Sequence, residues 1–330
     1  MKFAGVGVEE TVAPGTDNLR ISLRPHQLTK LEGVMKSSPE DDKKFLVDLT
    51  KVPSEQVAAW RETLDHLSQE VSQVANPPLQ VEERELEDGR KFRVVRDDNL
   101  QAGTKQRALV PLIVRHRAQE LVYASPIYGY AQVALAYSCK LAGGDKRGTV
   151  FVSRVSERHP LTKAAAAYGA KIMEVNRHGL AEVQEEANRY CQGDPVREHL
   201  PFGLYSAEFI WTLKTQIERA MPKDLHESPP SRVWVVAGSG TLVCALHEVW
   251  PQAEFLIVQV GKYVNEKMVE KIKHRVFVAP EKFGEEAVHP PPFSSAANYD
   301  AKLWQFFVKE AQPGDLIWNV ASDARSKAFE

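Results

Sequence analysis

The stretch that most constrains the fold of this chain is a polar loop that ends in a lysine at the start of an apolar helix. Residues 97–105 read DDNLQAGTK, follow a strand-like run and precede a mainly apolar segment. A second apolar run leads into a loop of small residues, which are Gly238, Ser239, Gly240 and Thr241. A strand, a small-residue loop and a helix in this order direct backbone N–H groups at an anion.

Together the two loops indicate a lysine that reacts with a carbonyl compound carrying a phosphate. Lysine condenses reversibly with carbonyls once its pKa is lowered, and the N–H groups of the second loop suit a phosphate. Pyridoxal 5'-phosphate has both groups. We therefore expect Lys105 to form a Schiff base with this cofactor, and residues 238–241 to hold its phosphate.

The segment from Asp97 to Leu109 resembles the lysine segment of the fold type II pyridoxal-phosphate enzymes, the tryptophan synthase β-like group. The resemblance covers roughly residues 85–323 and is nearest to the branch of 1-aminocyclopropane-1-carboxylate deaminase and D-cysteine desulfhydrase. It implies an α/β fold of two three-layer domains with mostly parallel sheets, here preceded by an N-terminal helical extension. The implied ranges are 1–84 for the extension, 85–109 with 201–330 for a larger cofactor-binding domain, and 110–200 for a smaller domain.

The pattern of the chain also predicts parallel sheets. An Asp-Gly turn at residues 88–89, between two alternating runs, predicts a β-hairpin. After it, short apolar runs alternate with helical segments, which predicts βαβ units. The expected strands cover residues 120–124, 149–153, 169–175, 233–237, 255–260 and 315–318. The charged stretch at 262–275 predicts a solvated helix face.

Ahead of the hairpin, the clearest helix is predicted over residues 53–76. Its apolar positions recur at spacings of three and four and lie on one face, at Val57, Trp60, Leu64, Leu67, Val71 and Val74. This stripe predicts packing on the rest of the chain, with a dimer contact as the alternative. A short strand at 19–24 and a helix at 26–36 are expected nearer the N-terminus.

The resemblance implies substrate contacts in the loop after the strand at 120–124. Ser125 and Gly129 match the family's loop that grips the substrate carboxylate. The family commonly has an Asn in this loop, which this chain lacks. Tyr128 or Tyr130 is therefore expected to replace the contact to the cofactor's ring hydroxyl, and Tyr130 and Tyr299 are expected at the substrate.

The resemblance also implies a partner for the cofactor's ring nitrogen after the last strand. By position this partner would be Asn319, with Ser322 as the second choice. A neutral partner suits proton abstraction and elimination. Asp323 is the acidic alternative, and it would favour decarboxylation or racemisation.

The resemblance implies a lyase or deaminase that removes the Cα proton of an amino acid, with Lys105 as the base. A second hypothesis keeps the cofactor and places the amino acid on a larger carrier, such as a modified thymidine in viral DNA, with decarboxylation as one outcome. A third is a degenerate relative that binds without catalysis. The homodimer common in the family is the expected assembly.

Composition excludes several other classes of protein. A hydrophobic content of 43% and a charged content of 26% are typical of globular proteins, and a net charge of −2 argues against coating nucleic acid. The three cysteines have no metal-ligand spacing, so we expect reduced thiols and no metal. Neither a signal peptide nor a membrane span is recognisable, and a cytoplasmic protein is expected.

Overall fold

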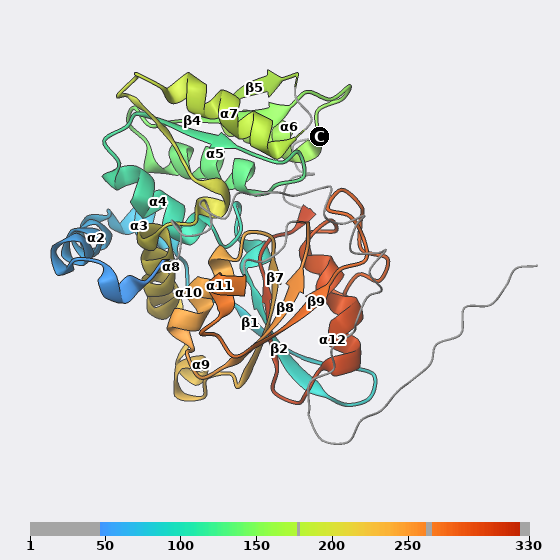
Figure 1. Ribbon diagram of the computed structural model, residues 1–330. Coiled ribbons are helices and arrows are strands. Elements are labelled where there is room, and N and C mark those ends of the chain that lie inside the picture. The colour runs from blue at the N-terminus through green and yellow to red at the C-terminus, as the bar shows by residue number, and fades with distance from the viewer. Residues whose placement is uncertain (1–46, 177–178, 262–265, 324–330) are drawn as a thin grey trace, which may run out of the picture. The chain divides into compact units, whose positions relative to one another are not determined.

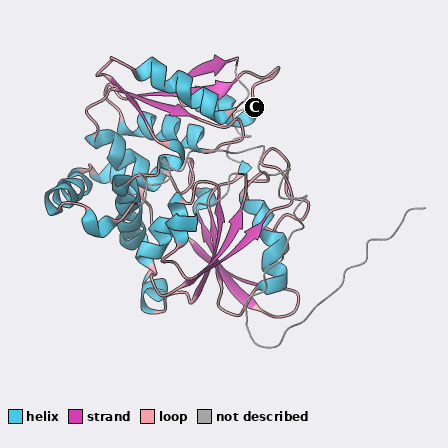
Figure 2. Ribbon diagram, in the orientation of Figure 1, coloured by secondary structure: helices cyan, strands magenta, loops and turns pink. Residues whose placement is uncertain are grey.

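The computed structural model describes residues 47–176, 179–261 and 266–323, which form two β-sheets with helices packed on them (Figures 1 and 2). The strand expected at 19–24 and the helix expected at 26–36 lie outside these residues. The α/β class with mostly parallel sheets is confirmed. The domain limits drawn from the sequence stay a prediction.

The larger sheet has six strands in the order β1-β2-β10-β7-β8-β9. The predicted hairpin is confirmed, because β1 pairs antiparallel with β2. The other neighbours in this sheet are parallel. The bounds are β1 Val81–Glu85, β2 Lys91–Arg96, β7 Arg232–Ala237, β8 Glu254–Gln259, β9 His274–Val278 and β10 Leu316–Asn319.

The smaller sheet has four parallel strands in the order β5-β4-β3-β6. Helices lie on both of its faces. Val122 and Phe151 pack on one side with Val183 of α7, whereas Leu121 and Val150 pack on the other side with residues of α5. Burial on both faces explains why the two central strands, β3 and β4, are mainly apolar and show no polar alternation. The bounds are β3 Glu120–Ala124, β4 Arg147–Ser153, β5 Lys171–Val175 and β6 Arg197–His199.

The helices complete the layers. α4, α8 and α10 share the largest apolar cluster with one face of the six-stranded sheet, and α12 packs on the opposite face through Phe307. The helical bounds are η2 Leu49–Lys51, α2 Ser54–His66, α3 Gln69–Ala75, η3 Asp97–Asn99, α4 Gln106–Arg115, α5 Ala131–Ala142, α6 Pro160–Ala167, α7 Leu180–Cys191, η4 Phe202–Leu204, α8 Ala207–Ala220, α9 Lys223–Glu227, α10 Thr241–Val249, α11 Glu266–Val269, η5 Asp300–Leu303 and α12 Trp304–Glu310.

The prediction of a single helix over 53–76 is wrong. The helix ends at His66, Leu67 is extended, and Ser68 caps a second helix by accepting a hydrogen bond from the backbone N–H of Val71. The predicted packing of the stripe on the rest of the chain is confirmed, because Trp60 and Leu64 are buried against Trp211 of α8. At the far end of the predicted stripe, Val74 is 46% exposed.

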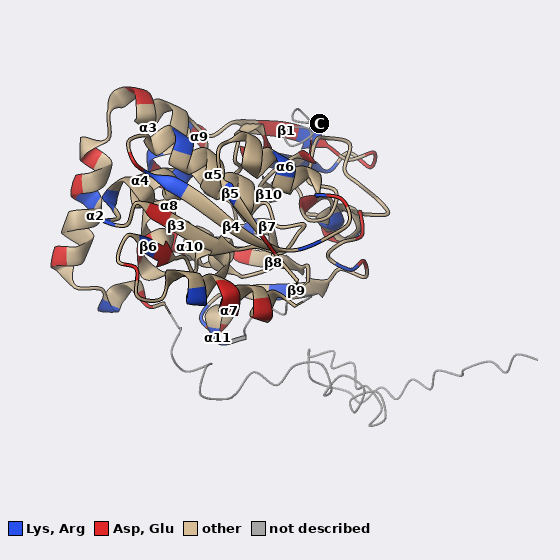
Figure 3. Cartoon of the chain, turned by 90° about the horizontal axis from the view of Figure 1, so that it is seen from above, with Lys and Arg blue, Asp and Glu red and all other residues tan. Residues whose placement is uncertain are grey.

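Acidic and basic residues are interspersed along α2 and α7 (Figure 3). In the described parts of the chain, no helix has the length and apolarity that crossing a bilayer requires. The same residues include no group of three or more His, Cys, Asp or Glu side chains arranged to hold a metal ion. All three cysteines are free thiols, as predicted.

Candidate active site

The lysine loop and the anion loop follow the carboxyl ends of neighbouring parallel strands. Residues 97–105 follow β2, residues 320–323 follow β10, and residues 238–241 follow β7, and these strands are adjacent in the order β2-β10-β7. In open α/β sheets, ligands bind in the crevice at the carboxyl ends of the strands. The topology therefore brings together two loops that lie more than 130 residues apart in the sequence.

The backbone ahead of Lys105 is tied to the residues after β10. The N–H of Thr104 donates to the carbonyl of Val320 at 3.1 Å, and the indole N–H of Trp318 donates to the Thr104 hydroxyl at 2.9 Å. Gly103 has φ +65°, and a Cβ there would lie 2.6 Å from the carbonyl oxygen of Val320. Only glycine fits this close approach, so the loop holds Lys105 at the first turn of α4.

Burial lowers the pKa of Lys105, and the nearby Asp300 carboxyl partly offsets this effect. Because the folded-state pKa lies below the unfolded value, this lysine contributes stability at high pH that is lost as the pH falls through the folded-state pKa. A lysine with a lowered pKa has a larger fraction of neutral amine near neutral pH. The neutral amine is the form that attacks carbonyls.

Asp300 is a site residue that the sequence analysis missed. Its side chain is 6% exposed, and its Oδ2 accepts a hydrogen bond from the backbone N–H of Ala321 at 3.0 Å. Its Oδ1 is buried and has no hydrogen-bond partner among the described residues. Burial, together with the charges of Asp98 and Asp323, raises the pKa of Asp300 well above its usual range.

We expect Asp300→Asn to lower the pKa of Lys105 further. Asparagine can still accept the hydrogen bond from Ala321, but it lacks the charge that opposes the effect of burial on the lysine. The pH dependence of Lys105 acetylation, followed by mass spectrometry of its peptide, measures this pKa. Asp315→Asn, at a buried carboxyl before the other end of β10, is the matched control. An unchanged or raised Lys105 pKa in the Asp300 variant would contradict the assignment.

The small-residue loop after β7 has the backbone of an anion-binding turn. Gly240 has φ +82° and caps α10, and the hydroxyls of Ser239 and Thr241 lie 3.0 Å apart. The N-terminus of α10, a helix of nine residues, therefore lies next to these two hydroxyls just after the buried strand β7. This arrangement suits a phosphate.

Gly203 lies against this loop and was also missed from the sequence. A Cβ at Gly203 would lie 2.2 Å from both Cβ and Oγ of Ser239, and the residue has φ +68°. The backbone N–H of Gly203 donates to the hydroxyl of Tyr123, which comes from the smaller sheet. The loop at η4 thus joins the smaller sheet to the anion loop.

Gly203→Ala is expected to displace Ser239 and to weaken binding of pyridoxal phosphate at least tenfold, because a charge-assisted hydrogen bond contributes about 1.5–3 kcal/mol. Gly89→Ala is the matched control. Gly89 also has a positive φ, +86°, but no heavy atom lies within 4 Å of its Cβ position. Calorimetric titration with pyridoxal phosphate measures the affinity of both variants. The Gly89 variant shows the effect of backbone strain alone, and any additional loss in the Gly203 variant comes from displacement of the loop. Unchanged affinity in the Gly203 variant would exclude this loop as the phosphate site.

Tyr299 connects the anion loop with Asp300. Its hydroxyl donates to the carbonyl of Val236 at 3.3 Å, and its ring lies 3.6 Å from the Cβ position of Gly238. Burial raises the pKa of this hydroxyl, so it stays protonated near neutral pH. The structure therefore brings together Lys105, the 238–241 loop and Tyr299. The prediction that Tyr299 contacts substrate remains untested.

The loop after β3 lies beside the lysine loop. Ser125 donates to the carbonyl of Pro126 at 2.9 Å and caps its own turn, next to Gly129. The hydroxyl of Tyr130 donates to the carbonyl of Gln101 at 3.3 Å, so Tyr130 contacts the lysine loop directly. The substrate roles of Ser125, Gly129 and Tyr130 stay predictions.

Tyr128 is placed differently from Tyr130. Its side chain is 37% exposed, and its ring makes edge contacts with His159 and Phe283 at centroid distances of 5.0 and 6.1 Å. A Cβ at Gly284 would lie 2.7 Å from this ring. Tyr128 therefore packs against the long loop between β9 and η5. Its predicted contact with the cofactor stays a prediction.

The three candidates for the ring nitrogen all contact residues 294–297 of that same long loop. Asn319 accepts a hydrogen bond from the Ser295 hydroxyl and donates to the carbonyl of Ser294, both at 2.8 Å. The hydroxyl of Ser322 bonds to that of Ser294, and Asp323 accepts from the backbone N–H of residue 297 at 2.6 Å. Which of the three meets the ring nitrogen stays open, and Asp300 joins them as a fourth candidate.

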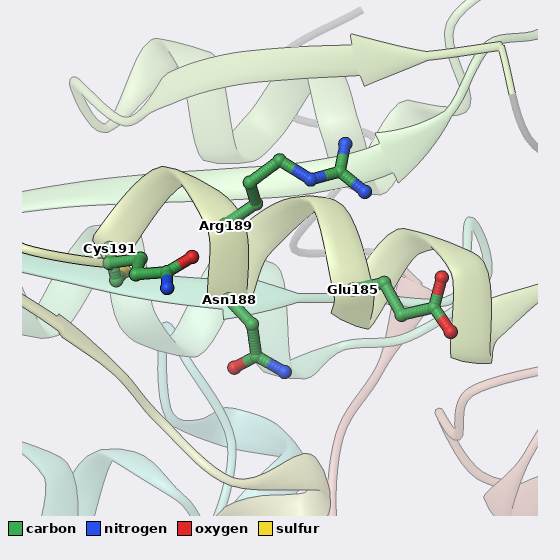
Figure 4. Close-up of a pocket in the computed structure, with 5 residues that line it drawn as sticks. Glu185, Asn188, Arg189 and Cys191 are labelled. Carbon is green, nitrogen blue, oxygen red and sulfur yellow. The ribbon is translucent and has the colours of Figure 1, made fainter.

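A separate pocket of about 500 Å³ lies on α7 of the smaller sheet (Figure 4). It is lined by Glu185, Asn188, Arg189, Cys191 and Gln192. Figure 4 shows Arg189 and Asn188 pointing away from one another. None of the predicted site residues lines this pocket, and its polar groups do not converge on a ligand.

Comparison with solved structures agrees with this arrangement, although neither a family model nor a curated protein matches the chain. The processed form of threonine deaminase isoform 2 from Solanum lycopersicum is 11% identical, with a TM-score of 0.58 over 84% of this chain and 93% of that one. A homologue of ACC deaminase is 12% identical, with a TM-score of 0.62 over 78% and 95%.

Escherichia coli diaminopropionate ammonia lyase, solved with an aminoacrylate-PLP azomethine intermediate, is 11% identical, with a TM-score of 0.55 over 84% of this chain and 91% of the lyase. A lysine loop, an anion loop and two sheets are thus arranged on a backbone shared with these enzymes. The chain has the fold of the fold type II pyridoxal-phosphate enzymes.

Proposed function

We propose that this chain binds pyridoxal 5'-phosphate through Lys105 and acts as a lyase or deaminase on an amino acid. The observation that supports the proposal is a lysine with a lowered pKa in the loop after β2, in the same sheet as the small-residue loop after β7, with one strand, β10, between the two. The similar solved structures include deaminases and ammonia lyases, which supports this class of reaction.

The residues present fit the cofactor in charge and in shape. The N-terminus of α10 would hold the phosphate, and Gly203, which has no side chain, lets η4 approach Ser239 closely and so supports the 238–241 loop. The unpartnered Oδ1 of Asp300 is available to a polar group of the ring. Bound pyridoxal phosphate supplies an electron sink that weakens the bonds to Cα of an amino acid. The two sheets are proposed to mark the two domains implied by the sequence resemblance.

Lys105 would also move the proton. With cofactor and substrate bound, the Lys105 amine would serve as the base for the Cα proton, and its lowered pKa would suit this role near neutral pH. The Asp300 carboxyl stabilises the ammonium form that results. No separate histidine base is needed. Tyr299, held in place by Val236, borders the same space and restricts the groups that enter it.

The experiment is a screen of free amino acids with the protein and pyridoxal phosphate, reading out ammonia and 2-oxo acid release. We expect turnover of at least one amino acid bearing a leaving group at Cβ. If the protein bound the cofactor but turned over no free amino acid, the substrate would not be a free amino acid. That result would favour an amino acid attached to a carrier. Failure to bind the cofactor would contradict the whole proposal.

A further inference from the structure

The segment between α3 and β1 contacts the residues that directly follow Lys105. The side-chain amide of Gln106 donates to the carbonyl of Val74 at 2.7 Å. Nη1 of Arg107 donates to Oδ1 of Asn76 at 2.6 Å and to the carbonyl of Pro77 at 2.8 Å. The first turn of α4 therefore lies against a segment that the family resemblance does not cover.

Asn76, Arg107 and Gln216 form a closed ring of hydrogen bonds. Nδ2 of Asn76 donates to the backbone carbonyl of Gln216 at 2.9 Å and to its Oε1 at 3.3 Å, and Nε2 of Gln216 donates to the carbonyl of Arg107 at 3.3 Å. That carbonyl would normally bond to the N–H four residues later, but Pro111 has none. The ring therefore satisfies a backbone group inside α4.

The remaining donors of Arg107 are also used. Nε and Nη2 donate to the carboxylate of Asp97 at 2.7–3.2 Å, and both side chains are 1% exposed. Gln106, on the other side, accepts from the backbone N–H of Ala102 in the lysine loop. A rotation of the first turn of α4 would break several buried hydrogen bonds at once, so Lys105 keeps one direction.

We propose that Asn76 is a positioning residue for Lys105 and acts through Arg107. This inference rests on the proposed function and extends it to a segment outside the lysine and anion loops. It assigns residues 74–77 to the support of the active site, through their hydrogen bonds to Gln106 and Arg107. Residues 74–77, ahead of β1, are therefore needed to keep Lys105 in its orientation.

The test compares Asn76→Ala, Asn76→Ser and Asn76→Asp in the full chain. Two readouts are used: the pH profile of Lys105 acetylation in the cofactor-free protein, and the affinity for pyridoxal phosphate. In the alanine and serine variants we expect the Lys105 pKa to rise toward its ordinary value, because a loosened lysine reaches water, and the affinity to fall roughly tenfold. The aspartate variant keeps the Oδ acceptor for Arg107 but loses the N–H groups that donate to Gln216, so we expect its Lys105 pKa and its affinity to lie between those of the wild type and of the alanine variant.

Asn188→Ala is the matched control, since its Oδ1 bonds to Nδ1 of His199 at 2.5 Å and the residue lies on α7, which packs on the smaller sheet. A folded alanine or serine variant with wild-type acetylation and affinity would overturn the proposal. A wild-type protein that takes up no pyridoxal phosphate would instead overturn the proposed function. The two failures are therefore distinguishable.

Discussion

Lys105→Ala is expected to abolish the visible absorbance band that the wild-type protein develops with pyridoxal phosphate, and to reduce turnover by at least about 10³-fold. Alanine removes both the amine that would hold the cofactor and the base that would move the Cα proton. The fold should survive, because burial of this amine lowers its pKa and so costs stability at neutral pH. Absorbance spectra and thermal unfolding, recorded side by side, check both statements.

Lys302→Met is the matched control for this experiment. Lys302 is fully buried, and burial lowers its pKa as it lowers that of Lys105. Its Nζ, however, donates to the carbonyl of Lys282 at 2.7 Å and is occupied in holding the long loop before η5. We expect this variant to keep the absorbance band. If the Lys302 variant lost the band and the Lys105 variant kept it, Lys302 rather than Lys105 would be the lysine that holds the cofactor.

Arg107→Ala is expected to destabilise the protein by about 3–5 kcal/mol, because it leaves the Asp97 carboxylate buried without its partner. Asp97 and Arg107 are each 1% exposed, and their closest contact is 2.7 Å. The same change frees the side chain of Asn76 and the carbonyl of Pro77. Urea unfolding at neutral pH measures the loss.

Arg275→Ala provides the comparison for a surface ion pair. Arg275 lies 2.9 Å from Glu310, but both side chains are more than 40% exposed. Its loss should cost at most about 1 kcal/mol. If the Arg107 variant were as stable as the Arg275 variant, Arg107 would not carry the packing of the lysine loop that we ascribe to it.

Sequence patterning predicted the buried strands, and it also predicted two edge strands, β1 from the Asp-Gly turn of its hairpin and β5 from its run after the preceding helix. β3, β4, β7 and β8 are apolar on both faces, which makes them recognisable as short runs between helices. The strands it missed lie at sheet edges. β6 has only three residues, and β9 is mostly exposed and follows a charged stretch that predicted a helix. Edge strands are short and polar, so their patterns resemble those of loops.

The helix predicted at 53–76 failed for a local reason. Spacings of three and four continue across Leu67 and Ser68, but Ser68 bonds to the backbone N–H of Val71 and starts a new helix. Serine competes with a helical backbone in this way. The second helix changes direction, and it brings the carbonyls of Val74 and Ala75 to Gln106.

The candidate site was predictable where chemistry and local pattern coincide in the sequence. Lys105 and the 238–241 loop each follow a strand and precede a helix, which marks them. Gly203 has no such context, because its role depends on contact with Ser239 across the fold. No local pattern marks Asp300 in the sequence, and only tertiary packing shows that one of its oxygens is buried without a partner among the described residues.

The most direct test of the central claim is to incubate the wild-type protein with pyridoxal phosphate, reduce it with borohydride, digest it and locate the modified lysine by mass spectrometry. The account predicts a pyridoxyl group on Lys105. Modification of Lys302 or of scattered surface lysines, or no stable modification at all, would contradict it.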